Sequence, residues 1–173
     1  MSTTSFTIRP ATIDDCRAIA EVHVASWQTT YRGQFPDRFL DELSVPEREE
    51  RWRESVLLKK WGDCLVAERD GAVVGFVNYG QGKDADAIAG GGEVYAIYLL
   101  SSAQGMGIGA SLWNQALDGL REQGFHEARV WVLDTNYSAG RFYERMGCVL
   151  EGAQKPAVID GAEVIEVRYC VAL

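Results

Sequence analysis

The sequence lacks a long apolar segment and any excess of positive charge. No apolar run approaches the roughly 20 residues that a membrane helix needs, and the opening residues, Met1–Thr4, have neither the basic flank nor the apolar segment of a signal peptide. The net charge is −8, whereas a general nucleic-acid binder needs a basic face to neutralise phosphates. A length of 173 residues suits one compact domain. We therefore expect a cytoplasmic single-domain protein, residues 1–173, that binds neither a membrane nor nucleic acid.

Cysteine and histidine are also scarce. Four cysteines stand singly within apolar patterns, at Cys16, Cys64, Cys148 and Cys170. No CxxC spacing links them, so we expect reduced, buried thiols and neither a disulfide framework nor a metal site. His23 falls on the apolar face of the first expected helix, which favours a hydrogen-bonded core histidine over a catalytic one, and His126 is expected at the surface. Without a histidine at an interpretable spacing, Cys148 is expected to be inert.

Apolar periodicity predicts strands and helices in a mixed order. Strands are expected at residues 6–9, 64–67, 73–77, 93–100, 128–133, 149–159 and 164–171, and helices begin near residues 12, 36, 46, 108 and 139. Asp70-Gly71 and Asp160-Gly161 favour the positive φ angles of tight hairpin turns. The glycine-rich residues 81–92 are expected to form a loop. The strand, helix and strand between residues 93 and 133 form a unit that is normally parallel and right-handed.

A segment with three glycines at alternate positions, Gln104–Ala110, stands between an apolar strand and a helix. Glycines there let the backbone approach a ligand closely, while the first amides of the helix point outward without a partner. Those amides and the positive end of the helix dipole suit a phosphate or pyrophosphate. A glycine-rich turn that only packs against its neighbours is the alternative.

A dinucleotide site is a second alternative for the same segment. Gly105-x-Gly107-x-x-Ala110 fits the dinucleotide-binding fingerprint, and Asp134 ends the next strand, somewhat beyond the usual distance. Such a domain needs further parallel strand–helix repeats, however, and the chain offers a hairpin after Asp134 instead. A nucleotide-dependent oxidoreductase is therefore disfavoured.

Two motifs in order give the sequence a resemblance to a known family. Gln104-x-x-Gly107-x-Gly109 resembles the acetyl-CoA signature of the GNAT superfamily of N-acetyltransferases. The second family signature is matched downstream by Asn136, Ala139, Phe142, Tyr143, Glu144 and Gly147. The resemblance implies a single-domain α+β fold with a mixed, mostly antiparallel sheet of six to seven strands and about four flanking helices. Two central parallel strands, 93–100 and 128–133, are implied to splay apart around the pantetheine arm of acetyl-CoA.

The resemblance also implies which residues hold the cosubstrate. Backbone groups around Ile97 and Leu99 would pair with pantetheine. The pyrophosphate would be bound by amides of Gln104, Gly105, Met106, Gly107, Ile108, Gly109 and Ala110. Asn136 would contact the cofactor arm, although an asparagine at this position also makes a good helix N-cap.

An amine must lose a proton before it can attack a thioester, because a lysine-like amine with a pKa of about 10.4 is almost entirely charged at pH 7. Glu93, eleven residues before Gln104, corresponds to a glutamate base in some family members, although it could merely begin the strand. Tyr143 matches the tyrosine that often protonates the departing coenzyme A sulfur. Core packing beside Phe142 is its alternative role.

The acceptor site is less defined than the donor site. Trp27 and Tyr31 lie one turn apart on the first expected helix and could present aromatic surface to a substrate, or could pack in the core. We expect an acetyl-CoA-dependent N-acetyltransferase that acts on a primary amine of a small molecule, amino acid or peptide. A non-catalytic acyl-CoA sensor on the same fold is the alternative. Strand edges left by the terminal hairpin make a homodimer plausible.

Overall fold

The computed structural model describes residues 5–86 and 90–173. The expectation about Met1–Thr4, and the part of the expected loop at residues 87–89, lie outside these ranges. No helix within them is long and apolar enough to cross a membrane. The chain forms two compact units. The first unit comprises Met1–Tyr79 and Ala96–Ala116, and the second comprises Gly80–Tyr95 and Leu117–Leu173.

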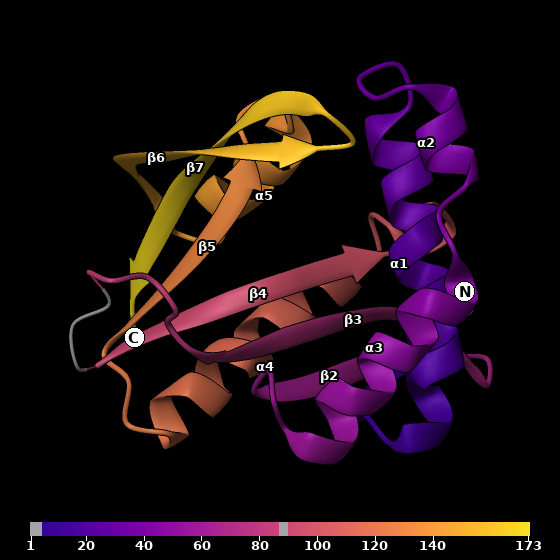
Figure 1. The fold of residues 1–173 in the computed structure, drawn as a ribbon. Helices are drawn as coiled ribbons and strands as arrows, with labels where there is room; N and C mark the ends of the chain where they lie inside the picture. Colours follow the sequence, from indigo (N-terminus) through magenta and orange to yellow (C-terminus); the bar gives the residue numbers. More distant parts are fainter. Residues whose placement is uncertain (1–4, 87–89) are drawn as a thin grey trace. The chain divides into compact units, whose positions relative to one another are not determined.

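Seven strands form one mixed sheet in the order β1-β2-β3-β4-β5-β7-β6 (Figure 1). The strands are β1 (Phe6–Pro10), β2 (Asp63–Arg69), β3 (Ala72–Gln81), β4 (Gly91–Leu99), β5 (Glu127–Leu133), β6 (Val149–Ile159) and β7 (Ala162–Ala172). The helices are α1 (Cys16–Tyr31), α2 (Asp37–Asp41), α3 (Val45–Leu58), α4 (Ile108–Glu122) and α5 (Tyr137–Arg145). The β4–β5 pair is parallel, while β1–β2, β2–β3, β5–β7 and β6–β7 are antiparallel. A doubly wound parallel sheet, and with it the dinucleotide-binding alternative, is therefore not the fold.

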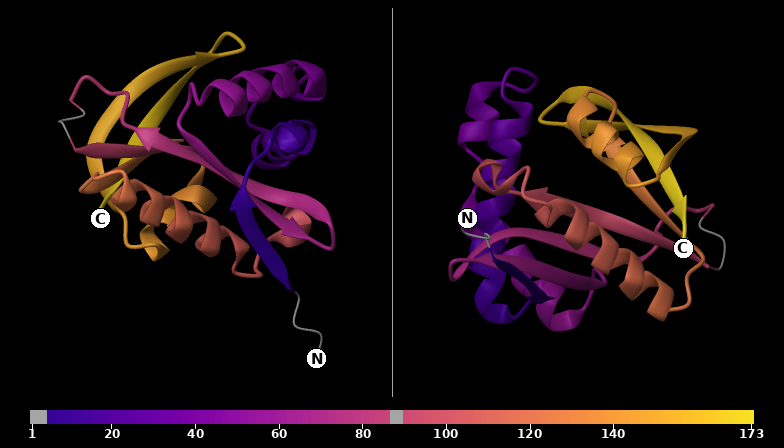
Figure 2. Two further views of the ribbon diagram at one scale, coloured as in Figure 1. Left: turned by 90° about the horizontal axis from the view of Figure 1, so that it is seen from below. Right: turned by 180° about the vertical axis from the view of Figure 1, so that it is seen from behind.

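The first unit has its core between the sheet and two helices. Helices α1 and α3 cover one face of β2 and β3, and the first part of α4 lies on the other face (Figures 1 and 2). Apolar residues at helical spacing on α1 meet side chains of α3 and the sheet in a cluster of Cys16, Ile19, Ala20, Val22, Trp52, Val66 and Phe76. The expected capping box is present, because the Thr12 N–H donates to the Asp15 carboxylate at 2.7 Å. Helix α1 thus begins where the sequence predicts, after one 3-10 turn.

The second unit is built around β5 and the terminal hairpin. Every residue of β5 pairs with β7, and α5 lies against one face of these two strands (Figure 2). The hairpin turns at Asp160 (φ 49°) and Gly161 (φ 76°), as expected from the sequence. In this unit the parallel ladder joins Gly91–Glu93 to Glu127–Arg129 and stops there, although β5 continues.

The glycine-rich loop is shorter than the sequence predicts. Gln81 is the last residue of β3, and β4 already begins at Gly91. Packing explains why a glycine stands inside the strand, since a Cβ atom at Gly92 would lie only 2.8 Å from Leu120 of α4. The glycine allows close approach of helix and strand here and does not mark a loop.

Candidate active site

The segment between β4 and α4 exposes residues 104–107 to solvent in the first unit. Gly105 and Gly107 have φ angles of 74° and 78°, a region that favours glycine. Among the described residues, no atom lies within 4 Å of where a Cβ would stand at either position. The buried Ile108 then anchors the first turn of α4. The exposed backbone at Gly105 and Gly107, directly before a helix N-terminus, fits a pyrophosphate.

The two strand residues expected to face pantetheine lie in the same unit. Ile97 and Leu99 are half-buried in the last part of β4. The Leu99 side chain approaches Gly75, where a Cβ would lie 2.6 Å from it, and the N–H of Leu100 donates to Val74 at 2.9 Å. The end of β4 is thus held against β3.

The two aromatic residues proposed for the acceptor differ in exposure. Tyr31 is only 5% exposed and packs between Trp27 and Phe35, at ring distances of 4.8 and 5.5 Å. Trp27 is half-buried, and its Nε1–H donates to the Tyr98 hydroxyl at 3.0 Å. Tyr31 therefore contributes mainly packing, while Trp27 and Tyr98 form a polar aromatic pair. Sequence reasoning missed Tyr98, whose only signal is its place one residue after Ile97.

His23 is a core residue, as the sequence favours. Its Nδ1 accepts a hydrogen bond from Trp52 at 3.2 Å, and its ring stacks on Tyr98. Burial, with help from the positive charges of Arg48 and Arg51, lowers the pKa of His23 to about 3. The imidazole is therefore neutral at physiological pH.

The candidate base, Glu93, lies within the second unit in the parallel part of β4. It stands opposite Arg129 in the ladder and is 9% exposed. Its Oε2 accepts the backbone N–H of Lys83 at 3.0 Å. Burial raises the pKa of the Glu93 carboxyl above its ordinary value, and Asp84 adds to this effect. The Lys83 N–H and the ammonium groups of Lys83 and Lys155 oppose the shift.

The two lysines that lower the pKa of Glu93 each stack on an aromatic ring. The Lys83 ammonium lies 3.8 Å from the centre of the Tyr95 ring, and the Lys155 ammonium lies 4.1 Å from that of Trp131. Burial and the nearby Glu93 raise the pKa of Tyr95 to about 12. None of these residues belongs to a sequence motif, because they come from four separate segments. Sequence reasoning therefore missed them.

The second family motif places Asn136 and Tyr143 on α5. Asn136 is the N-cap, and its side-chain oxygen accepts the Ala139 N–H at 3.1 Å. Tyr143 is 5% exposed, with its ring packed near Phe142 and Tyr169. The structure thus contains the capping and packing interactions that were the alternatives for both residues. Neither interaction prevents a second role.

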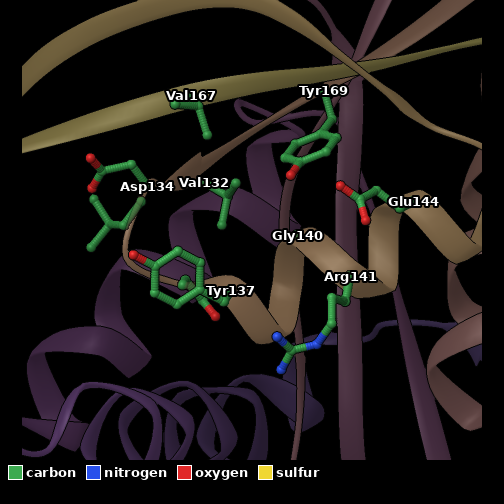
Figure 3. Close-up of a pocket in the computed structure, with 10 residues that line it drawn as sticks. Val132, Asp134, Tyr137, Gly140, Arg141, Glu144, Val167 and Tyr169 are labelled. Carbon is green, nitrogen blue, oxygen red and sulfur yellow. The ribbon is translucent and has the colours of Figure 1, made fainter.

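A hollow of about 150 Å³ lies between α5 and the strands β5 and β7 (Figure 3). Asn136 lines it and Tyr143 does not. The Tyr169 side chain extends from β7 toward Gly140, with its hydroxyl facing the helix. A Cβ at Gly140 would lie 2.8 Å from that hydroxyl. Glycine at this helical position therefore lets Tyr169 approach α5.

The four cysteines are free thiols; Cys16 and Cys148 are buried as expected, whereas Cys64 and Cys170 are only half-buried. Cys148 is buried, and burial raises its pKa to about 12. A thiol with that pKa is almost wholly protonated near neutral pH. Cys148 is therefore unsuited to carry an acyl group as a nucleophile.

Comparisons with known proteins agree with this geometry. Residues 22–148 match the model of the acetyltransferase (GNAT) family. An uncharacterized N-acetyltransferase of Bacillus subtilis, YuaI, is 36% identical over 132 residues, which cover 76% of this chain and 74% of the relative. One from Archaeoglobus fulgidus is 32% identical over 145 residues, covering 79% and 88%.

Solved structures share the fold. The PaiA N-acetyltransferase of Thermoplasma acidophilum, solved in complex with coenzyme A, superposes with a TM-score of 0.75 and 24% identity over 94% of this chain and 98% of its own. This structure shows the fold alone, whereas the family model and the B. subtilis relative show the family. This chain belongs to the GNAT family of acetyltransferases and is an N-acetyltransferase.

Proposed function

We propose that this N-acetyltransferase transfers the acetyl group of acetyl-CoA directly to a primary amine of a small molecule, an amino acid or a peptide. The protein acts as one domain, residues 1–173, in the cytoplasm. The observation that carries the catalytic proposal is the buried carboxylate of Glu93, whose pKa is raised by that burial. A carboxylate in such a setting suits a proton acceptor better than a purely structural strand residue.

Donor binding rests on backbone groups of the first unit. The amides from Gln104 to Ala110 bind the pyrophosphate, and backbone groups around Ile97 and Leu99 pair with the pantetheine arm. The exposed backbone and open space at Gly105 and Gly107 support this role. When bound, acetyl-CoA supplies the acetyl group as a thioester. Asn136 of the second unit contacts the cofactor arm in addition to capping α5.

Glu93 acts as general base, directly or through a water molecule. Keeping a lysine-like amine neutral at pH 7 costs about 4.6 kcal/mol, because its pKa is about 10.4. The raised pKa of the Glu93 carboxyl brings the base closer to working pH, which favours proton transfer. The ammonium groups of Lys83 and Lys155 also disfavour a charged acceptor amine nearby.

Tyr143 acts as general acid and protonates the coenzyme A sulfur as it departs. Its buried position on α5 limits solvent access to the hydroxyl. A thiol with a pKa of about 8.5 is already a tolerable leaving group, so the rate contribution of this acid is modest. Trp27 contributes aromatic surface to the acceptor, and Tyr31 supports Trp27 from the core.

A second copy of this chain covers the edge of the sheet. Strand β6 is one of the two edge strands and exposes Val149, Leu150 and Val158. Such an exposed apolar edge strand favours pairing with another chain. Sedimentation velocity at micromolar concentration is expected to show a dimer, and a monomer would overturn this point.

Thermal shift with acetyl-CoA, coenzyme A and NAD, followed by thiol release from acetyl-CoA with a panel of amines, tests the proposed reaction. We expect both coenzyme A compounds to raise the melting temperature and a subset of amines to accelerate thiol release. Stabilisation by NAD alone would overturn the donor assignment. Stabilisation by acetyl-CoA without amine-dependent thiol release would instead indicate a sensor.

A further inference from the structure

An arginine buried in the second unit holds the segment that precedes β4. Arg168 of β7 is 5% exposed. Its guanidinium donates to Asp86 at 2.8 and 2.9 Å and to Asp84 at 3.0 Å, and its Nε donates to Glu151 of β6. Two of its three acidic partners therefore belong to one short segment, 84 and 82 residues away in sequence.

The same segment is fixed to β5 by an aromatic donor. The Nε1–H of Trp131 donates to Asp84 at 2.8 Å, and Trp131 stands opposite Arg168 in the β5–β7 ladder. Arg129, two residues earlier on β5, contacts Asp86 at 3.5 Å. Strands β5 and β7 thus hold both aspartates through charge-assisted hydrogen bonds.

This anchored segment touches the candidate base. Lys83 directly precedes Asp84, and its backbone N–H donates to Glu93 Oε2 at 3.0 Å. The charged or titratable groups around Glu93 come from several elements: Lys83 and Asp84 from this segment, Tyr95 from β4, Lys155 from β6 and Arg129 opposite in β5. The position of the Lys83 amide therefore depends on where Asp84 and Asp86 are held.

A buried guanidinium is unfavourable without acidic partners, and a fixed pair of hydrogen bonds gives it a defined orientation. Arg168 meets this requirement with carboxylates from two sides, Asp84 and Asp86 on one and Glu151 on the other. Asp84 and Asp86 belong to the segment whose Lys83 amide contacts Glu93, whereas Glu151 lies on β6 and approaches Arg129 at 3.9 Å. Asp86 and Glu151 can therefore be neutralised separately. Asp86 belongs to the segment that contacts Glu93, and Glu151 does not.

We propose that Arg168 is a positioning residue for acetyl transfer, because its grip on Asp84 and Asp86 keeps the Lys83 amide on the Glu93 carboxylate. The inference rests on the proposed role of Glu93 as general base. Arg168 itself touches neither substrate nor reacting atoms in this assignment; it acts through the segment Lys83–Asp86.

The test compares Asp86→Asn with Glu151→Gln, since each removes one negative charge from Arg168 and only Asp86 belongs to the anchored segment. Asp86 is an exposed side chain, so the variant should fold. We expect Asp86→Asn to lower kcat by roughly 10- to 100-fold, because a displacement of about 1 Å at a reacting group can cost about 100-fold, with little change in KM for acetyl-CoA. The acid limb of its kcat/KM profile should move to higher pH, because the Lys83 amide that this variant displaces lowers the pKa of the Glu93 carboxyl.

Glu151→Gln should keep the wild-type acid limb and a kcat near that of the wild type. Equal changes in both variants, or no change in Asp86→Asn, would overturn the positioning role. Arg168→Lys, which keeps the charge but loses the paired hydrogen bonds, should behave like Asp86→Asn.

Glu93→Gln, measured in parallel, separates this inference from the function on which it rests. If Glu93→Gln is inactive while Asp86→Asn behaves as wild type, only the role of Arg168 fails. If Glu93→Gln keeps wild-type activity and the acid limb, the base assignment fails, and the positioning role of Arg168 fails with it.

Discussion

The proposed donor segment and the proposed base are built in opposite ways. Residues Gln104–Ala110 offer backbone amides, and their geometry needs only glycines and a helix start. Glu93 offers one side chain, and its pKa depends on burial and on groups from other segments of the second unit. A site made of backbone is defined locally. A site made of side chains is defined by contacts between residues far apart in sequence.

Because the donor segment binds through backbone amides, we expect its affinity for acetyl-CoA to depend on the charge of side chains introduced into it. Gly107 is a poor place to test this, because its φ of 78° would strain any other residue. Gly109 lies within the first turn of α4 and does not have a positive φ. Asp is favourable for a helix at this position, yet it places a negative charge where a pyrophosphate should bind.

We therefore expect Gly109→Asp to weaken acetyl-CoA binding by roughly 10- to 100-fold, equivalent to about 1.4 to 2.7 kcal/mol. Gly109→Asn has nearly the same shape without the charge and should retain most of the affinity. Isothermal titration calorimetry measures both. Equal affinities for the two variants would contradict the pyrophosphate assignment.

A smaller effect is expected from the proposed acid. Tyr143→Phe removes only the hydroxyl and keeps the ring that packs near Phe142 and Tyr169. Turnover should fall by about tenfold or less, because the coenzyme A thiol is already a tolerable leaving group. Acetyl-CoA affinity should not change. Steady-state kinetics and calorimetry on the same preparation separate the two effects, and unchanged turnover would remove Tyr143 from the mechanism.

The locally determined features are the ones that the sequence predicts. Both aspartate–glycine hairpin turns, the capping box at Thr12, the N-cap at Asn136 and the glycine segment follow from neighbouring residues, and the structure has all of them. The sequence places Gly92 in a loop, but the residue lies in β4, where its missing side chain makes room for Leu120 from α4. The packing of Tyr31, one of its two expected roles, likewise involves Phe35 from the following segment.

The surroundings of Glu93 could not be predicted for the same reason. The sequence marks Glu93 by its distance from Gln104, but nothing near it in sequence indicates Arg168 or Trp131. Arg168 reaches Asp84 across 84 positions of the chain. The pairing of β5 with β7 places Trp131 opposite Arg168.

The most direct test of the central claim is the pH dependence of kcat/KM for the wild type and Glu93→Gln, with the exposed Glu163→Gln as control. The wild type should show an acid limb above the ordinary glutamate pKa of about 4.3, because burial raises the pKa of Glu93. Glu93→Gln should lose that limb and about 100-fold or more in kcat/KM, while Glu163→Gln matches the wild type. A Glu93→Gln enzyme with the wild-type rate and acid limb would contradict the account.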